Sequence, residues 1–150
     1  MNVEYFLYPT LPDNHIVDEL VAIHKLIFET TEDLKTKMGT KPKLLILIAM
    51  DNNKVIGYKI GYEQDSQTFY SWLGGVDPDY RTHGIASMLM EKQHHYLKEK
   101  GYRVVRTKTM NKWRHMLLLN IKYGFDVIDT YTDEKGLHKI ILEKKLLTNE

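Results

Sequence analysis

The residues best suited to chemistry lie in one stretch near the middle of the chain, from Gly74 to Ala86. Gly74–Val76 ends a run of β-forming residues, and Gly84 begins a long helical pattern. The first backbone N–H groups of a helix have no partner inside the helix and lie at the positive end of its dipole. A phosphate group can therefore bind at Arg81–Ala86 through backbone hydrogen bonds, and the small Gly84 and Ala86 let its oxygens approach.

This loop does not carry the motifs of the common nucleotide sites. It has no Gly-Lys-Ser/Thr sequence, which a Walker loop needs, and it lacks the three spaced glycines of a dinucleotide fold. ATP and NAD are therefore poor fits. A glycine-containing turn from a strand to a helix is often only a turn, and that reading stays open beside the phosphate site.

Other reactive side chains are less informative. The chain has no cysteine, which removes disulfides, thiolate metal sites and a thioester-forming nucleophile together. His94 and His95 resemble a metal pair, but consecutive helix residues diverge by about 100° and cannot easily share one ion. We expect surface histidines at both positions, and we expect His83 to point to solvent.

Two further groups could line a binding site. Tyr70 and Trp72 share one face of their strand by the period of two, and we expect one in the core and the other in an acceptor pocket. Lys108, Lys112 and Arg114 could meet a phosphate of the ligand or form an ordinary solvated face.

The charge and length of the chain limit the class of protein. With 21 basic and 20 acidic residues the net charge is +1, which gives no general attraction for nucleic acid or an anionic membrane. A length of 150 residues suits one domain over 1–150. The N-terminus has neither a basic start nor an apolar run of signal-peptide length, and no stretch has the length of a membrane span. We therefore expect a cytoplasmic protein.

The elements that must position the loop follow from periodicity and turn residues. We predict strands at 3–8, 44–49, 54–62, 68–76, 103–109, 125–132 and 137–146, and helices at 16–28, 32–37, 84–100 and 113–121. In the last helix we expect Leu117, Leu118 and Ile121 to face inward. Strands come first as a meander, then alternate with helices and return as a hairpin, which favours an α/β (α+β) domain around one twisted sheet.

These motifs resemble those of the GNAT superfamily, the Gcn5-related N-acetyltransferases. The loop Arg81-Thr82-His83-Gly84-Ile85-Ala86 matches the family's pyrophosphate loop, Gln/Arg-x-x-Gly-x-Gly/Ala. The preceding Val76-x-Pro78-x-Tyr80 matches the segment that leads into it, and Gly124-Phe125 resembles the second signature. The resemblance in element order covers nearly the whole chain, whereas the motifs occupy about residues 74–125.

The resemblance implies a mostly antiparallel twisted sheet of about seven strands with about four helices and splayed central strands. It implies an N-acetyltransferase that moves an acetyl group from acetyl-CoA directly to a primary amine. The amine is carried by a small molecule or a protein, and either a monomer or a homodimer is compatible with the sequence. The cofactor-binding residues are then Gly74, Gly75, Val76, Arg81, Thr82, His83, Gly84, Ile85, Ala86, Asn111 and Asn120. Gly74 and Gly75 also suit a bulge that separates two strands for the thioester.

The catalytic residues depart from the family pattern. Many members have a tyrosine four residues before the glycine of Gly-Phe, as the acid for the departing thiolate, and this chain has Asn120 there. We therefore take Tyr123 as the candidate acid, Asn111 as a residue that caps the next helix and touches the cofactor, and Glu63 as the candidate base. The missing tyrosine keeps an alternative open, a module of this shape that binds acyl-CoA without turnover.

Overall fold

The structure of the chain is a computed structural model, and it describes residues 1–146. The strands are β1 (Val3–Tyr8), β2 (Leu45–Asp51), β3 (Lys54–Glu63), β4 (Thr68–Val76), β5 (Val104–Thr109), β6 (Asp126–Thr132) and β7 (His138–Lys145). The helices are α1 (Asn14–Phe28), α2 (Leu34–Gly39), α3 (Ile85–Glu99) and α4 (Arg114–Lys122), with a short 3₁₀ turn, η1, at Pro78–Tyr80. Among these residues, no helix is long and apolar enough to cross a membrane.

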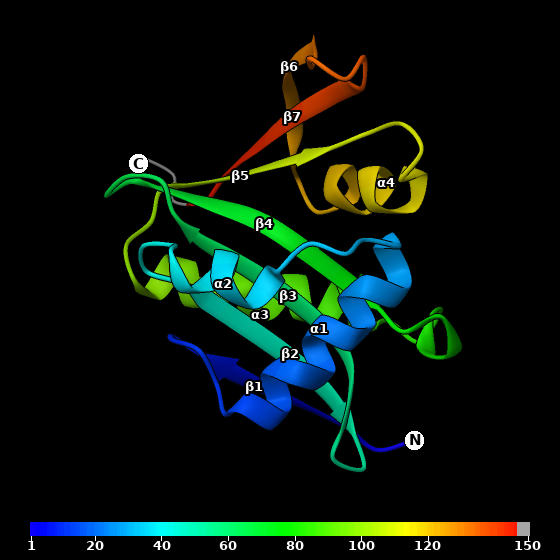
Figure 1. The fold of residues 1–150 in the computed structure, drawn as a ribbon. Coiled ribbons are helices and arrows are strands. Elements are labelled where there is room, and N and C mark those ends of the chain that lie inside the picture. Colours follow the sequence, from blue (N-terminus) through cyan, green and yellow to red (C-terminus); the bar gives the residue numbers. More distant parts are fainter. Residues whose placement is uncertain (147–150) are drawn as a thin grey trace.

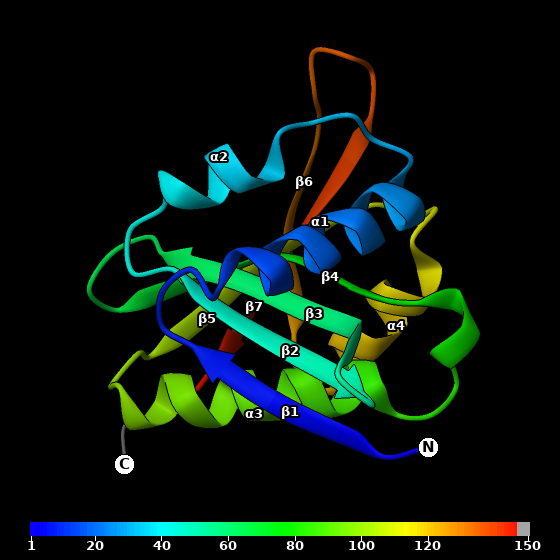
Figure 2. The same cartoon turned by 60° about the horizontal axis from the view of Figure 1, so that its bottom comes forward.

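Seven strands form one twisted sheet in the order β1-β2-β3-β4-β5-β7-β6. All neighbouring strands are antiparallel except β4 and β5, which run parallel. Helices α1 and α2 cover one face, and α3 lies on the other (Figures 1 and 2). The sheet therefore has a core on each face, because apolar residues of β2 and β3 alternate between the α3 side and the α1 side.

The predicted elements are all present, and their ends agree within one or two residues. This confirms the mixed seven-stranded sheet with four helices. The predicted inward face of α4 is right for Leu117, which packs against the core, and wrong for Leu118 and Ile121. Leu118 and Ile121 are 58% and 49% exposed, whereas the polar Asn120 is buried. The apolar residues of this short helix lie on several of its sides, so periodicity alone does not indicate which side faces the core.

Candidate functional site

The parallel strands β4 and β5 separate part-way along their length. They pair only from Thr68 with Val104 to Ser71 with Thr107, and β4 continues to Val76 without β5 beside it. Figure 1 shows the two strands diverging from this point, with α4 beside the gap. This confirms the predicted splay of the central strands and leaves one backbone edge of β4 without a strand partner.

The bulge that accompanies the splay is not at the two glycines. Ile60 faces Leu73 and Gly61 faces Ser71, so Trp72 is the extra residue on β4. Gly74 and Gly75 pair regularly with β3, which corrects the prediction that they form the bulge. A Cβ at Gly75 would lie 2.8 Å from Cδ1 of Ile27, so this glycine allows helix α1 to pack closely on β4.

The predicted phosphate loop leads directly from β4 into the start of α3. Gly84 occupies the N-cap position with a left-handed φ of 74°, and no side chain of the described residues caps the helix. The first turn of α3 has no acidic residue. A Cβ at Gly84 would have no described atom within 4 Å. The first N–H groups of α3 are therefore available to an anion from outside the chain.

Side chains on both sides hold this loop in place. The Arg81 guanidinium donates from Nε to the carbonyl oxygen of Val76 at 3.2 Å, which joins the loop to the end of β4. The Tyr80 hydroxyl donates to Oδ2 of Asp51 at 3.0 Å, which joins it to β2. Thr82 has a φ of 68°, a strained conformation for a β-branched residue. The neighbouring His83 is exposed, as expected.

Lys59 is a buried lysine that the sequence analysis missed. It pairs with Gly74 across β3 and β4, and its side chain is on the α3 face of the sheet, where it is only 7% exposed. Its Nζ lies 3.9 Å from the position that a Cβ of Gly74 would take. Among the described residues, the Lys59 ammonium has no hydrogen bond or ion pair. Burial lowers the pKa of Lys59 to about 8.

A signal for this lysine was present in the sequence. Positions 57, 59 and 61 of β3 share one face by the period of two, and the other two are glycines. A lysine between inward-facing glycines has room to lie over the neighbouring strand. The sequence could therefore have indicated a buried cation, although not its place beside the unpaired edge of β4.

The two predicted asparagines have different surroundings. Asn120 is 2% exposed, but the buried side-chain atoms without a hydrogen-bond partner among residues 1–146 are Gln93 Oε1 and His94 Nε2, and its amide is not one of them. Asn111 is exposed in the turn between β5 and α4. The N-cap of α4 is Trp113, so the prediction that Asn111 caps this helix is wrong. Of these two asparagines, Asn120 is therefore the buried one.

The candidate acid and base both have partners. The Tyr123 hydroxyl donates to Oε1 of Glu91 on α3, at the long distance of 3.4 Å. The Tyr102 hydroxyl donates to Oε1 of Glu63 at 2.8 Å. Glu63 pairs with Phe69, two residues before the strands separate, so its carboxylate lies at the closed end of the splay. Each side chain is therefore held by a hydrogen bond to another residue of the chain.

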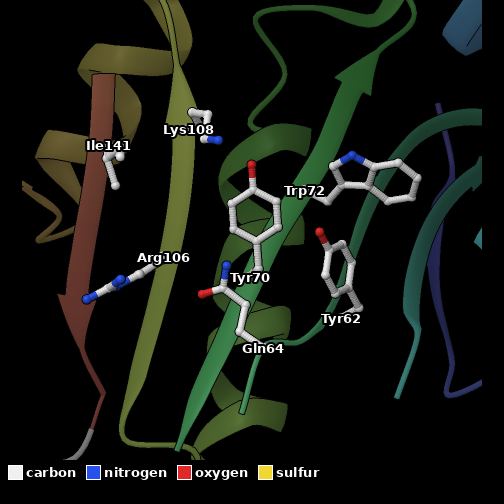
Figure 3. Close-up of a pocket in the computed structure, with 7 residues that line it drawn as sticks. All are labelled: Tyr62, Gln64, Tyr70, Trp72, Arg106, Lys108 and Ile141. Carbon is white, nitrogen blue, oxygen red and sulfur yellow. The ribbon is translucent and has the colours of Figure 1, made fainter. Parts of the chain in front are cut away.

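A hollow of about 390 Å³ lies on the other face of the sheet, beside the closed end of the splay (Figure 3). We call it the aromatic hollow, and it is lined by Tyr62, Gln64, Tyr70, Trp72, Arg106, Lys108 and Ile141. Tyr70 and Trp72 both line it and both are half-buried, and Trp72 also packs against the core on the α1 face. Lys112 is not part of it, because its Nζ lies over the Trp113 ring at 4.8 Å.

The paired histidines also differ from expectation. His95 is exposed and its Nε2 lies 3.0 Å from Oε1 of Glu99. His94 is only 4% exposed, and Nζ of Lys144 donates to its Nδ1 at 3.0 Å. Burial, followed by the charge of Lys144, lowers the pKa of His94 to about 3, so this imidazole is neutral. His94 is therefore a core residue and not a surface histidine.

Solved structures share this fold at low identity. A GNAT family acetyltransferase from Elizabethkingia anophelis with acetyl-CoA bound is 19% identical, covers 96% of this chain and 98% of its own, and has a TM-score of 0.74. The matching chain of the NatC complex bound to Gag peptide and CoA is 18% identical, covers 99% of this chain and 100% of its own, and has a TM-score of 0.83. An aminoglycoside 6'-N-acetyltransferase complexed with coenzyme A is 12% identical, covers 100% of this chain and 99% of its own, and has a TM-score of 0.80.

No curated protein sequence matches the chain. The family model of the Acetyltransferase (GNAT) family matches residues 14–116, which is more than half of the chain. This match includes the splayed strands, the phosphate loop and helix α3. The resemblance inferred from the loop is therefore confirmed, and the chain belongs to the GNAT acetyltransferase family.

Proposed function

We propose that this enzyme transfers an acetyl group from acetyl-CoA directly to a primary amine. The observation that carries the proposal is the separation of β4 from β5 next to the uncapped start of α3. This arrangement combines an anion site with a strand edge that has no strand partner and can pair with an extended ligand. The acetyl-CoA and CoA bound by the structural neighbours support the same ligand.

The residues present fit such a ligand. Backbone N–H groups of Arg81–Ala86 would bind the pyrophosphate, and the edge of Gly74–Val76 would pair with the pantetheine arm. Asn120 is buried, and its amide would contact a polar group of the ligand. Asn111 is exposed and would contact the ligand only at its outer end. When bound, acetyl-CoA supplies the activated acyl group, and the chain supplies the binding and the proton transfers.

Acyl transfer requires two proton movements. An amine with an ordinary pKa of about 10.4 is almost fully protonated at neutral pH and must lose a proton before it can attack. The departing thiolate must in turn receive a proton or be stabilised by a positive charge. The tyrosine that serves this purpose in many family members is Asn120 here, and an amide is not an acid near neutral pH.

Lys59 is our proposed proton donor to the departing sulfur. Its ammonium lies over Gly74, at the strand edge where we place the pantetheine arm. A pKa of about 8 is close to the ordinary thiol value of about 8.5, so a proton can pass between the two groups with little free-energy cost. A buried cation without a partner destabilises the fold, and the developing thiolate would provide the missing negative charge.

Glu63 stays our predicted base and Tyr123 a predicted second donor. Because Glu63 lies at the closed end of the splay, we propose that it receives the amine proton through water. Tyr123 would have to leave Glu91 to reach the gap, and the 3.4 Å hydrogen bond between them is weak enough to allow this. Both assignments are secondary to that of Lys59.

The test is thiol release from acetyl-CoA in the presence of a panel of primary amines. We expect release that depends on both the enzyme and the amine, and an N-acetylated product identified by its mass. The competing function is an acyl-CoA sensor, which the absent tyrosine favours. Binding of acetyl-CoA without release by any amine, across neutral and alkaline pH, would support the sensor and contradict the transferase.

A further inference from the structure

The aromatic hollow has walls that are already assembled. The Tyr62 ring meets the rings of Tyr70 and Trp72 edge-on, with centroids 5.4 and 5.7 Å apart. Figure 3 shows the three rings side by side on the open face of β3 and β4, with Lys108 of β5 above Tyr70. Rings that hold one another in place provide a rigid surface for the body of a ligand.

The unpaired charges around these rings are positive. Lys108 and Arg106 line the hollow, and Nζ of Lys41 lies 4.8 Å from the centroids of both Tyr62 and Trp72. Arg106 is neutralised by Glu143, with Nε 2.7 Å from Oε2. Lys41 and Lys108 have no ion pair within the described part of the chain, and none of the described lining residues is acidic. The hollow therefore has an excess of positive charge.

The position of the hollow connects it to the proposed reaction. Tyr70 and Trp72 flank Ser71, the last residue of β4 that pairs with β5. The hollow lies on the face opposite α3 (Figure 3). Lys59 and the start of α3 lie on the other face. An amine that enters the gap from this face would leave the rest of its molecule over the three rings and beside Lys108.

We propose that the acceptor of this enzyme is a primary amine that also carries a carboxylate, and that polycationic amines are rejected. This inference rests on the proposed transferase function. Lys41 and Lys108 attract an anionic group and repel a second ammonium, and the rings contact the apolar part of the acceptor. The aminoglycoside acetyltransferases share the fold, but a polycation would find no negative charge in this hollow.

The experiment uses acceptors in matched pairs that differ by one carboxylate. Free amino acids are compared with their amides, and peptides that begin with Asp-Asp are compared with peptides that begin with Asn-Asn. Spermidine and kanamycin represent polycations. Thiol release gives kcat/KM for each acceptor, and quenching of Trp72 fluorescence in a Trp113→Phe background gives binding without turnover. The amino acid and peptide arms distinguish a small molecule from a protein N-terminus.

Charge reversal at the hollow should reverse the preference. We expect the carboxylated member of a pair to be favoured by about tenfold, and Lys108→Glu to abolish or invert that ratio. Lys112→Glu is the matched control, because it changes the net charge equally at a lysine outside the hollow. An unchanged ratio in Lys108→Glu, or polycations as the best ligands, would overturn the inference. Charge-selective binding without turnover of any amine would instead count against the proposed function.

Discussion

The two faces of the sheet at the splay differ in how they are built. On the α3 face, the site consists of backbone groups of a loop and a few buried polar side chains, of which Lys59 is one. On the opposite face, the aromatic hollow consists of side chains from strands β3, β4, β5 and β7. The phosphate loop of the first face is one continuous segment, whereas the hollow is assembled from the side chains of four strands.

This difference suits two different tasks. A loop that binds through its backbone can recognise the same phosphate groups with many sequences, so it is suited to a ligand common to a whole family. A surface of side chains changes with each substitution and is suited to an acceptor that differs among relatives. We therefore expect substitutions on the α3 face to affect acetyl-CoA and those in the hollow to affect the acceptor.

The largest effect is expected from Gly84→Val. A branched side chain at the N-cap would block the approach of phosphate oxygens to the first N–H groups of α3. Loss of two charge-assisted hydrogen bonds would lower acetyl-CoA affinity by about a hundredfold or more. Calorimetric titration measures this affinity.

Valine at Gly84 is also strained, because the φ of this residue is positive. Gly136→Val is the matched control, since Gly136 has a φ of 80° and no described atom within 4 Å of its Cβ position, but lies in the β6–β7 turn. Both variants should lose similar stability, and only Gly84→Val should lose affinity. Equal affinities would show that the phosphate does not bind at this loop.

Lys59→Met should lower turnover by about a hundredfold, the effect expected for loss of a general acid. The same variant should be more stable, because an apolar side chain replaces a buried cation without a partner. In the wild type, the thiol of bound CoA should ionise about 1 pH unit lower than in the variant, since a nearby ammonium favours the thiolate. Ultraviolet absorbance of the thiolate during a pH titration measures this shift without an acceptor.

The pH dependence of Lys59 has a definite sign. Its pKa of about 8 is below the unfolded value of about 10.4, so the unfolded chain binds more protons between these values and stability rises with pH there. That rise should be absent in Lys59→Met. The titratable group that the charge of Lys59 influences is His94 of α3. Lys98→Met, which removes an exposed cation, should change neither the thiol nor the stability profile.

Glu63→Gln should have a smaller effect, about tenfold on turnover, because its carboxylate lies at the closed end of the splay. A base in direct contact with the amine would cost about a hundredfold or more. Tyr102→Phe removes the 2.8 Å hydrogen bond from Tyr102 to Glu63 but keeps the carboxylate. It therefore separates the charge of Glu63 from its structural role. Equal turnover losses in the two variants would mean that Glu63 is not a base.

The smallest effect is expected from Tyr123→Phe, a loss of a few-fold in turnover. Its hydroxyl donates to Glu91 and not into the gap, so only a rearrangement of the end of α4 would bring it to the sulfur. The variant is compared with Glu91→Gln, which weakens the same contact from the other side. Full loss of activity in Tyr123→Phe alone would make this tyrosine the acid and displace Lys59 from that role.

Sequence reasoning worked where function depends on a continuous segment. The loop Arg81–Ala86, the strand before it and the helix after it lie next to one another in the chain, so turn residues and periodicity placed them. The bulge at Trp72 depends instead on how β3 pairs with β4, and the burial of Lys59 depends on Gly74 across that pair. These contacts join two strands, so the pattern within one strand could indicate a buried lysine but not its place over Gly74.

The aromatic hollow could not be predicted from the sequence for the same reason. Tyr70 and Trp72 could be placed on one face of a strand, but the neighbouring lysines come from β5 and from the turn after α2. Alternation shows which residues share a face and not what covers that face. The error in α4 had another cause, since a helix that is apolar on several sides gives periodicity no clear direction.

The most direct test of the central claim is a thermal melt with acetyl-CoA and with CoA. At a hundred times its dissociation constant, a ligand that binds only the folded chain adds about 2.7 kcal/mol of stability. For a chain of this length, that corresponds to a rise of about 5 to 10 °C in Tm. We predict such a rise for wild type and Gly136→Val, and a rise of at most about 2 °C for Gly84→Val, whose affinity is about a hundredfold lower. Wild-type protein that is folded and free of copurified ligand, yet shows no rise with either compound, would contradict the account.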